Sequence, residues 1–90
     1  MFSKKQCEIA RAFTQSNATD SQINLEYWRL NDSQKKASCK KLSAKLIELN
    51  IPIDKGWPLL KNDFESIAKE LDIDPTTLFC VFMDWQSKNN

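Results

Sequence analysis

Residues 64–83 read FESIAKELDIDPTTLFCVFM, and this stretch decides the fold that we expect for the chain. Its hydrophobic residues recur at intervals of three and four, which predicts two short helices. Between them, Asp72, Ile73 and Asp74 favour a tight turn. Asp74 followed by Pro75 is typical of the first residues of a helix, because proline has no N–H to lose there. The stretch therefore predicts a corner between two packed helices.

The spacing within this corner is that of a helix-turn-helix motif. Ile67 and the small Ala68 allow the second helix to approach the first closely, and Leu71 follows three residues later. Asp72 occupies the turn position where the backbone becomes left-handed. Glycine is usual there, but aspartate tolerates that conformation better than most other residues. The remaining positions of the pattern are Ile73, Leu78 and Val81.

On these residues the chain resembles the bacterial and phage helix-turn-helix regulators, over residues 64–83 only. The resemblance implies that the outward face of the second helix enters the major groove of DNA. Carried onto this chain, that face consists of Asp74, Pro75, Thr76, Thr77, Phe79, Cys80, Met83 and Asp84. It lacks the Arg, Lys, Asn and Gln side chains that read bases, and its two aspartates repel phosphates. We therefore expect a helix-turn-helix scaffold without base recognition.

The apolar residues left on this face have three interpretations. They are part of the core, covered by the N-terminal helices, or they form a surface that contacts another protein, including a second copy of the chain, or they contact thymine methyl groups in a DNA groove. The residues that we assign to a protein interface under the second interpretation are Thr76, Phe79, Cys80 and Met83.

The rest of the chain predicts three more helices before the corner, in residues 3–15, 19–30 and 33–50. One glycine and one valine among 90 residues also favour helices over strands. Residues 50–60, NIPIDKGWPLL, hold the glycine and two prolines, which predicts a packed linker before a fourth helix capped by Asn62.

We therefore expect an all-α fold, a compact five-helix single domain over residues 1–90. Its helix-turn-helix-like unit spans residues 63–87, near the C-terminus. The second, third and fifth helices are expected to supply most of the core.

Positive charge gathers in the N-terminal half. Residues 1–50 carry nine basic and five acidic side chains, whereas residues 51–90 carry four basic and seven acidic ones. A basic cluster on the third helix suits DNA phosphates, although the solvated face of a long helix looks the same. The residues that we assign to DNA phosphate contact are Lys35, Lys36, Lys40, Lys41 and Lys45.

Other classes of function find little support. Cys7, Cys39 and Cys80 are scattered and the chain has no histidine, so we expect no metal site and no cofactor. Free thiols are typical of the reducing cytoplasm, where we expect the protein to act. A histidine base, a glycine-rich phosphate loop and a nucleophile elbow are all missing, which argues against an enzyme. The N-terminus does not read as a signal peptide, and no apolar run approaches the ~18 residues of a membrane span.

Two hypotheses of function follow. The first is a small regulatory protein of bacterial, phage or plasmid type, which acts largely through protein contacts and touches DNA phosphates without sequence specificity. The second is an inhibitor or adaptor that binds no DNA, such as an antirepressor, an anti-defence factor or an immunity protein. Both predict a protein partner or a homodimer, and only the first adds DNA.

Overall fold

The computed structural model describes residues 2–89, and for residues 53, 54 and 89 it describes the backbone alone. Within this range the chain forms five helices and no strand, which confirms the predicted all-α class. The helices are α1 (Lys4–Thr14), α2 (Asp20–Arg29), α3 (Asp32–Leu49), α4 (Ile53–Leu71) and α5 (Pro75–Asn89).

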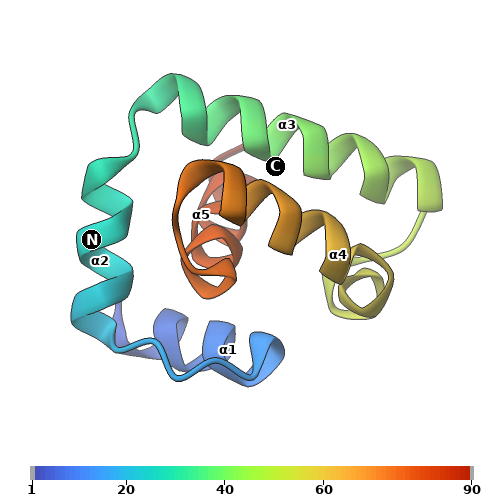
Figure 1. Cartoon of the computed structure of the whole chain (residues 1–90). Coiled ribbons are helices and arrows are strands. Elements are labelled where there is room, and N and C mark those ends of the chain that lie inside the picture. The colour runs from blue at the N-terminus through green and yellow to red at the C-terminus, as the bar shows by residue number, and fades with distance from the viewer. Residues whose placement is uncertain (1, 90) are drawn as a thin grey trace.

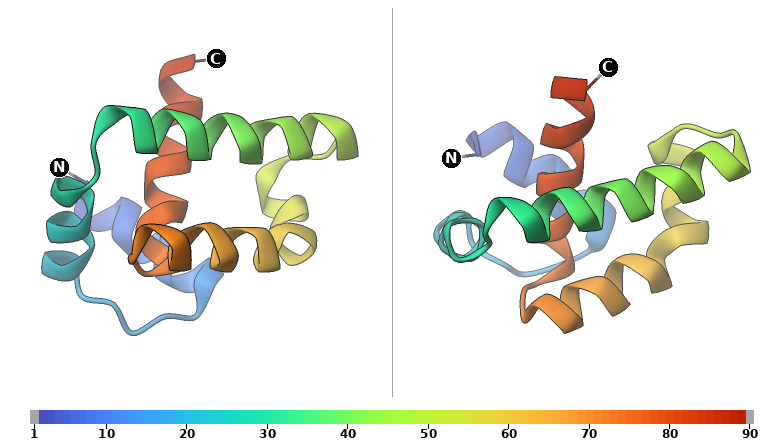
Figure 2. Two further views of the ribbon diagram at one scale, coloured as in Figure 1. Left: turned by 45° about the horizontal axis from the view of Figure 1, so that its top comes forward. Right: turned by 90° about the horizontal axis from the view of Figure 1, so that it is seen from above.

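The C-terminal helix α5 is the centre of the molecule. In Figure 1, α2 lies on one side of it, α3 above it, α1 below it and α4 in front, and both views of Figure 2 agree with this arrangement. Each of the other four helices contacts α5. Leu78, Phe79 and Phe82 of α5 are all fully buried. The core is therefore built around a helix that lies at the end of the sequence.

Local capping explains where the first three helices begin. The Ser3 hydroxyl accepts a hydrogen bond from the N–H of Gln6, whose side chain accepts one from the N–H of Ser3. Asn31 opens α3 with the same reciprocal arrangement. At Thr19 the hydroxyl accepts from the N–H of Gln22. These caps satisfy backbone donors that have no partner within the helix, so short sequence signals are enough to place the helix starts.

The predicted linker over residues 50–60 is wrong, because α4 already begins at Ile53. Asn62, the predicted cap, lies inside this helix. Pro58 is in its second turn and removes one backbone hydrogen bond, which bends a helix without necessarily ending it. Figures 1 and 2 show the first part of α4 turned away from the rest. Packing compensates for the lost bond, since Trp57 is buried against Phe64 and Phe79.

The corner between α4 and α5 has the predicted local geometry. Asp72 is left-handed, with φ 58° and ψ 46°. The N–H of Ile73 donates to the carbonyl of Ala68 at 2.9 Å, which satisfies one of the last carbonyls of α4. At the start of α5, the Asp74 carboxylate accepts from the N–H of Thr76 at 2.9 Å. Ala68 is buried at this corner, as its small size predicted.

Candidate functional site

The predicted protein interface on α5 lies inside the molecule. Thr76, Phe79 and Cys80 are at most 1% exposed, so they cannot form an outer surface of this fold, and of the four residues only Met83 is partly exposed. Helix α1 covers them. The Phe13 ring stacks on Phe79 with centroids 5.2 Å apart, and the hydroxyls of Thr14 and Thr76 are 2.7 Å apart. The core interpretation therefore holds for Thr76, Phe79 and Cys80.

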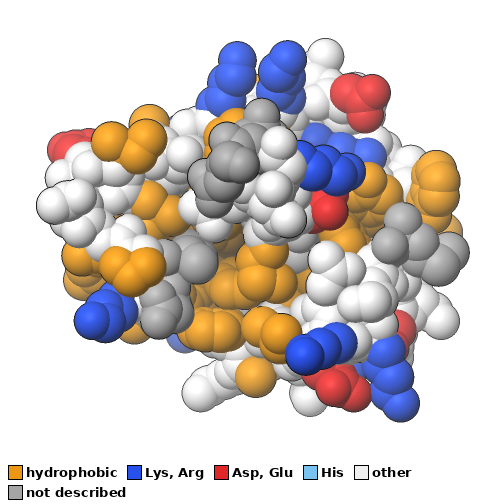
Figure 3. All heavy atoms as spheres, turned by 180° about the vertical axis from the view of Figure 1, so that it is seen from behind, with side chains coloured by type: hydrophobic (Ala, Val, Ile, Leu, Met, Phe, Trp, Pro, Cys, Tyr) orange, Lys and Arg blue, Asp and Glu red, His pale blue; other side chains and the backbone are white. Residues whose placement is uncertain are grey.

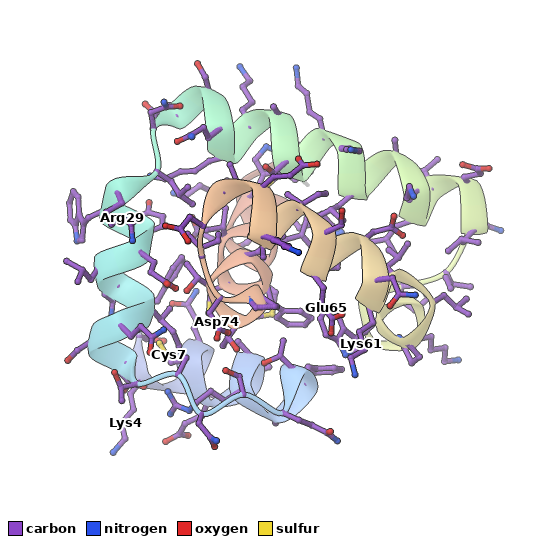
Figure 4. All side chains as sticks on the ribbon, in the orientation of Figure 1. Lys4, Cys7, Arg29, Lys61, Glu65 and Asp74 are labelled. Atoms are coloured by element: carbon purple, nitrogen blue, oxygen red, sulfur yellow. The ribbon has the colours of Figure 1, made fainter. Side chains whose placement is uncertain are left out.

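Helix α2 also covers the start of α5. The Glu26 carboxylate accepts from the Thr77 hydroxyl at 2.6 Å and from the N–H of Asp74 at 3.1 Å. Figure 4 shows Asp74 at the start of α5, facing α1, and the Ser16 hydroxyl donates to its carboxylate at 3.1 Å. A helix start attracts anions, and two carboxylates of the chain already occupy this one. Sequence reasoning did not single out Glu26, because nothing local to it signals this contact.

The five lysines assigned to phosphate contact divide into two groups. Lys45 forms an ion pair with Asp63 of α4 at 2.5 Å. The ammonium of Lys35 lies 3.8 Å from the centre of the Tyr27 ring. Both cations therefore contact other helices of this chain, and their assignment to phosphate contact stays a prediction.

Lys36, Lys40 and Lys41 make up the second group. All three side chains are exposed, and within residues 2–89 none of them has an ion pair. Lys36 and Lys40 are one turn apart and share a face of α3. Figure 3 shows basic side chains along the edge of the molecule over α3. This exposed part of the predicted lysine cluster is available to an anionic partner.

A depression of about 290 Å³ lies between α2, α3 and α5 beside these lysines. Tyr27 and Trp85 line it together with Lys35, Lys36 and Lys88. Trp85 stacks on Phe82 with centroids 6.4 Å apart, and Lys88 pairs with Asp84 at 3.1 Å. The sequence has no aromatic residue among the lysines of α3, so only the fold brings aromatic and basic side chains together here.

The outer face of α2 carries exposed hydrophobic side chains. Leu25 is 65% exposed and Trp28 is 67% exposed. Trp28 packs edge-on against Tyr27 with ring centroids 6.0 Å apart. Arg29 follows it and forms an exposed ion pair with Asp72 at 3.4 Å. Figure 4 labels Arg29 on α2, across from the end of α4. We call Leu25, Trp28 and Arg29 the α2 face.

A second group of exposed hydrophobic side chains lies where α3 ends and α4 begins, away from the α2 face in Figure 1. It consists of Ile47, Leu49 and Leu59, which are 75%, 41% and 64% exposed. On the side seen in Figure 3, hydrophobic side chains also gather over α1 and α5.

The described residues contain no group of acidic and cysteine side chains that could hold a metal ion. None of the helices in residues 2–89 is long and apolar enough to cross a membrane. Comparisons with protein-family models, with curated proteins and with solved structures found no match.

Proposed function

We propose that this chain is a small regulatory protein of the helix-turn-helix-like type that acts by binding another protein through the α2 face. The observation that carries the proposal is the exposure of Trp28 and Leu25 one turn apart, on the side of α2 that faces away from the core. Tryptophan and arginine are the residues that most often dominate binding energy at protein interfaces. The α2 face offers both beside a leucine.

The burial of α5 favours a protein partner over base recognition. In a helix-turn-helix regulator the second helix must reach the bases, but here α1 and α2 cover its first turns. Reading bases with α5 would require both helices to leave. A partner that binds the α2 face requires no such rearrangement. The accessible α2 face equally supports the alternative of an inhibitor or adaptor. That alternative differs from the regulatory protein only in that it binds no DNA.

A change of charge at the α2 face tests the proposal. In a Leu25→Asp, Trp28→Asp double variant, we expect at least a tenfold loss of partner binding with an unchanged thermal midpoint, because neither side chain is buried. Solution mass across a concentration series detects self-association. Retention of proteins from an extract of the native host detects a different partner.

Ile47→Asp, Leu59→Asp is the matched control, because it adds the same charge at similarly exposed hydrophobic positions on the other end of the molecule. It should bind like the unchanged protein. The proposal fails if the unchanged protein remains monomeric and retains no partner, or if the control loses binding and the α2 variant does not.

Contact with DNA phosphates is a second candidate function. It is favoured by Lys36, Lys40 and Lys41 on α3, which are exposed and form no ion pair with the residues that the structure describes. Such contacts are independent of base sequence and depend strongly on salt. They do not use α5, so the covering of α5 does not affect them.

A further inference from the structure

Two cysteines from opposite ends of the sequence meet in the core. Cys7 of α1 is 0% exposed and Cys80 of α5 is 1% exposed. Besides burial, each thiol shifts the pKa of the other, as expected for neighbouring groups. The Cys80 sulfur is also 3.9 Å from the carbonyl oxygen of Gln6, the residue before Cys7. Figure 4 shows Cys7 on the side of α1 that faces the other helices.

The third cysteine has different surroundings. Cys39 is on α3, and its sulfur is 3.9 Å from the carbonyl oxygen of Val81. Among the described residues, no other cysteine shifts the pKa of Cys39, which burial and Asp84 raise. The fold therefore separates the three thiols into one neighbouring pair and one single thiol, which their spacing in the sequence does not indicate.

The pair lies within the contact by which α1 covers α5. Phe13 on Phe79 and Thr14 on Thr76 belong to the same contact. A covalent bond between the two sulfurs would join α1 to α5. We propose that Cys7 and Cys80 form a reversible disulfide by exchange with a low-molecular-weight disulfide, and that the bond fastens α1 over α5. This proposal does not depend on the α2 face.

The exchange proceeds in two balanced steps. The Cys7 thiolate attacks one sulfur of the oxidant, which breaks its S–S bond and releases one thiolate. The Cys80 thiolate then attacks the Cys7 sulfur of this mixed disulfide, which forms the Cys7–Cys80 bond and releases the second thiolate. The two protons that the cysteines lose end on the two released thiols. The protein loses two electrons, and the oxidant gains them.

Burial makes the exchange slow in the closed molecule. It raises the pKa of Cys7, and it raises the pKa of Cys80 to about 12, because a thiolate loses its hydration in the core. The thiolate is the reactive species, and the oxidant cannot reach a sulfur that is fully covered. The bond therefore forms while α1 is transiently lifted or while the chain folds, and it then holds α1 in place.

Mapping of the thiols tests the proposal. The complete chain is equilibrated with mixtures of reduced and oxidised glutathione, its free thiols are then alkylated under denaturing conditions, and the protein is digested with trypsin. We expect residues 6–11 to be linked to residues 70–88, whereas the peptide of residues 37–40 carries an alkylated Cys39. Cys39→Ala should still form the bond, and Cys7→Ser should not.

Amide hydrogen exchange tests the effect on α1. In the oxidised protein, exchange of residues 4–14 should be at least tenfold slower than in the reduced protein, with a smaller change in α4. The disulfide is refuted if all three thiols remain alkylatable, or if the links involve Cys39 or join two chains. The fastening is refuted if the Cys7–Cys80 link forms and exchange in α1 stays the same. Peptide mapping of the unchanged chain shows whether the Cys7–Cys80 disulfide forms, even if the Cys7→Ser variant does not fold.

Discussion

At the scale of single residues, Glu26 joins two helices of the core. Its carboxylate bridges α2 to the start of α5, where it accepts hydrogen bonds from the Thr77 hydroxyl and the Asp74 N–H. Thr77 is fully buried, so no water can replace this acceptor without a local opening. A buried donor left without a partner costs about 1–3 kcal/mol.

Glu26→Ala should therefore lower the free energy of unfolding by about 1–3 kcal/mol, because it leaves the Thr77 hydroxyl without its acceptor. Glu26→Gln should cost less, since it keeps one oxygen at this position and loses only the charge near the helix start. Urea unfolding followed by circular dichroism measures both. Equal losses in the two variants would mean that the charge, and not the acceptor, stabilises this junction.

At the scale of helices, α1 covers one side of α5, and the other three helices contact its other sides. Only 11 residues long, α1 is too short to be stable alone in water, so its helical structure depends on packing against its neighbours. Its contact with α5 combines the Phe13 ring with the hydroxyl pair of Thr14 and Thr76. The part of α5 that α1 covers thus depends on a few side chains of one short helix.

Phe13→Ala should lower the free energy of unfolding by about 1–3 kcal/mol, below the 3–5 kcal/mol of a fully buried Phe→Ala change because Phe13 is only partly buried. Ile9→Ala, on the same helix at a position 39% exposed, should cost less than about 1 kcal/mol. Urea unfolding compares the two. If they are equally mild, the stacking of Phe13 on Phe79 does not hold α1 in place.

At the scale of the whole molecule, the fold keeps the charge separation of the sequence. In the N-terminal half, Lys36, Lys40 and Lys41 are exposed together on α3, whereas in the C-terminal half Asp74 caps α5 and Asp63 and Asp84 pair with lysines. The chain as a whole carries a net charge of only +1. Any attraction to a polyanion must therefore come from this local face and not from the total charge.

The salt dependence of DNA binding tests this face. If this face contacts phosphates, duplex binding should be measurable at low salt and should weaken as salt rises. The slope of log K against log salt should become less negative by about 2 in the Lys40→Glu, Lys41→Glu double variant, since each lost contact removes about 1. Lys61→Glu, Lys69→Glu on α4 is the control, because it changes the net charge equally. No binding at low salt, or equal slopes in both variants, would exclude specific use of α3.

Much of the local structure could be predicted from the sequence. The helices predicted over residues 3–15, 19–30 and 33–50 begin within one residue of α1, α2 and α3, and Asp72 takes the predicted left-handed turn before α5. Caps and turns depend on groups a few residues apart, so they can be predicted locally. The same local reasoning failed at Pro58. A proline that reads as a breaker is tolerated within α4, where the burial of Trp57 compensates for the missing hydrogen bond.

The sequence by itself determined that the chain is helical, where most helices begin, and that α4 and α5 meet at a tight corner. Only the tertiary structure decided that α5 lies at the centre, that Glu26 caps it from α2, and that Cys7 meets Cys80. It also left Trp28 outside and Phe79 inside. The physical reason is that a hydrophobic face must be covered by something, but its periodicity does not specify which distant helix covers it.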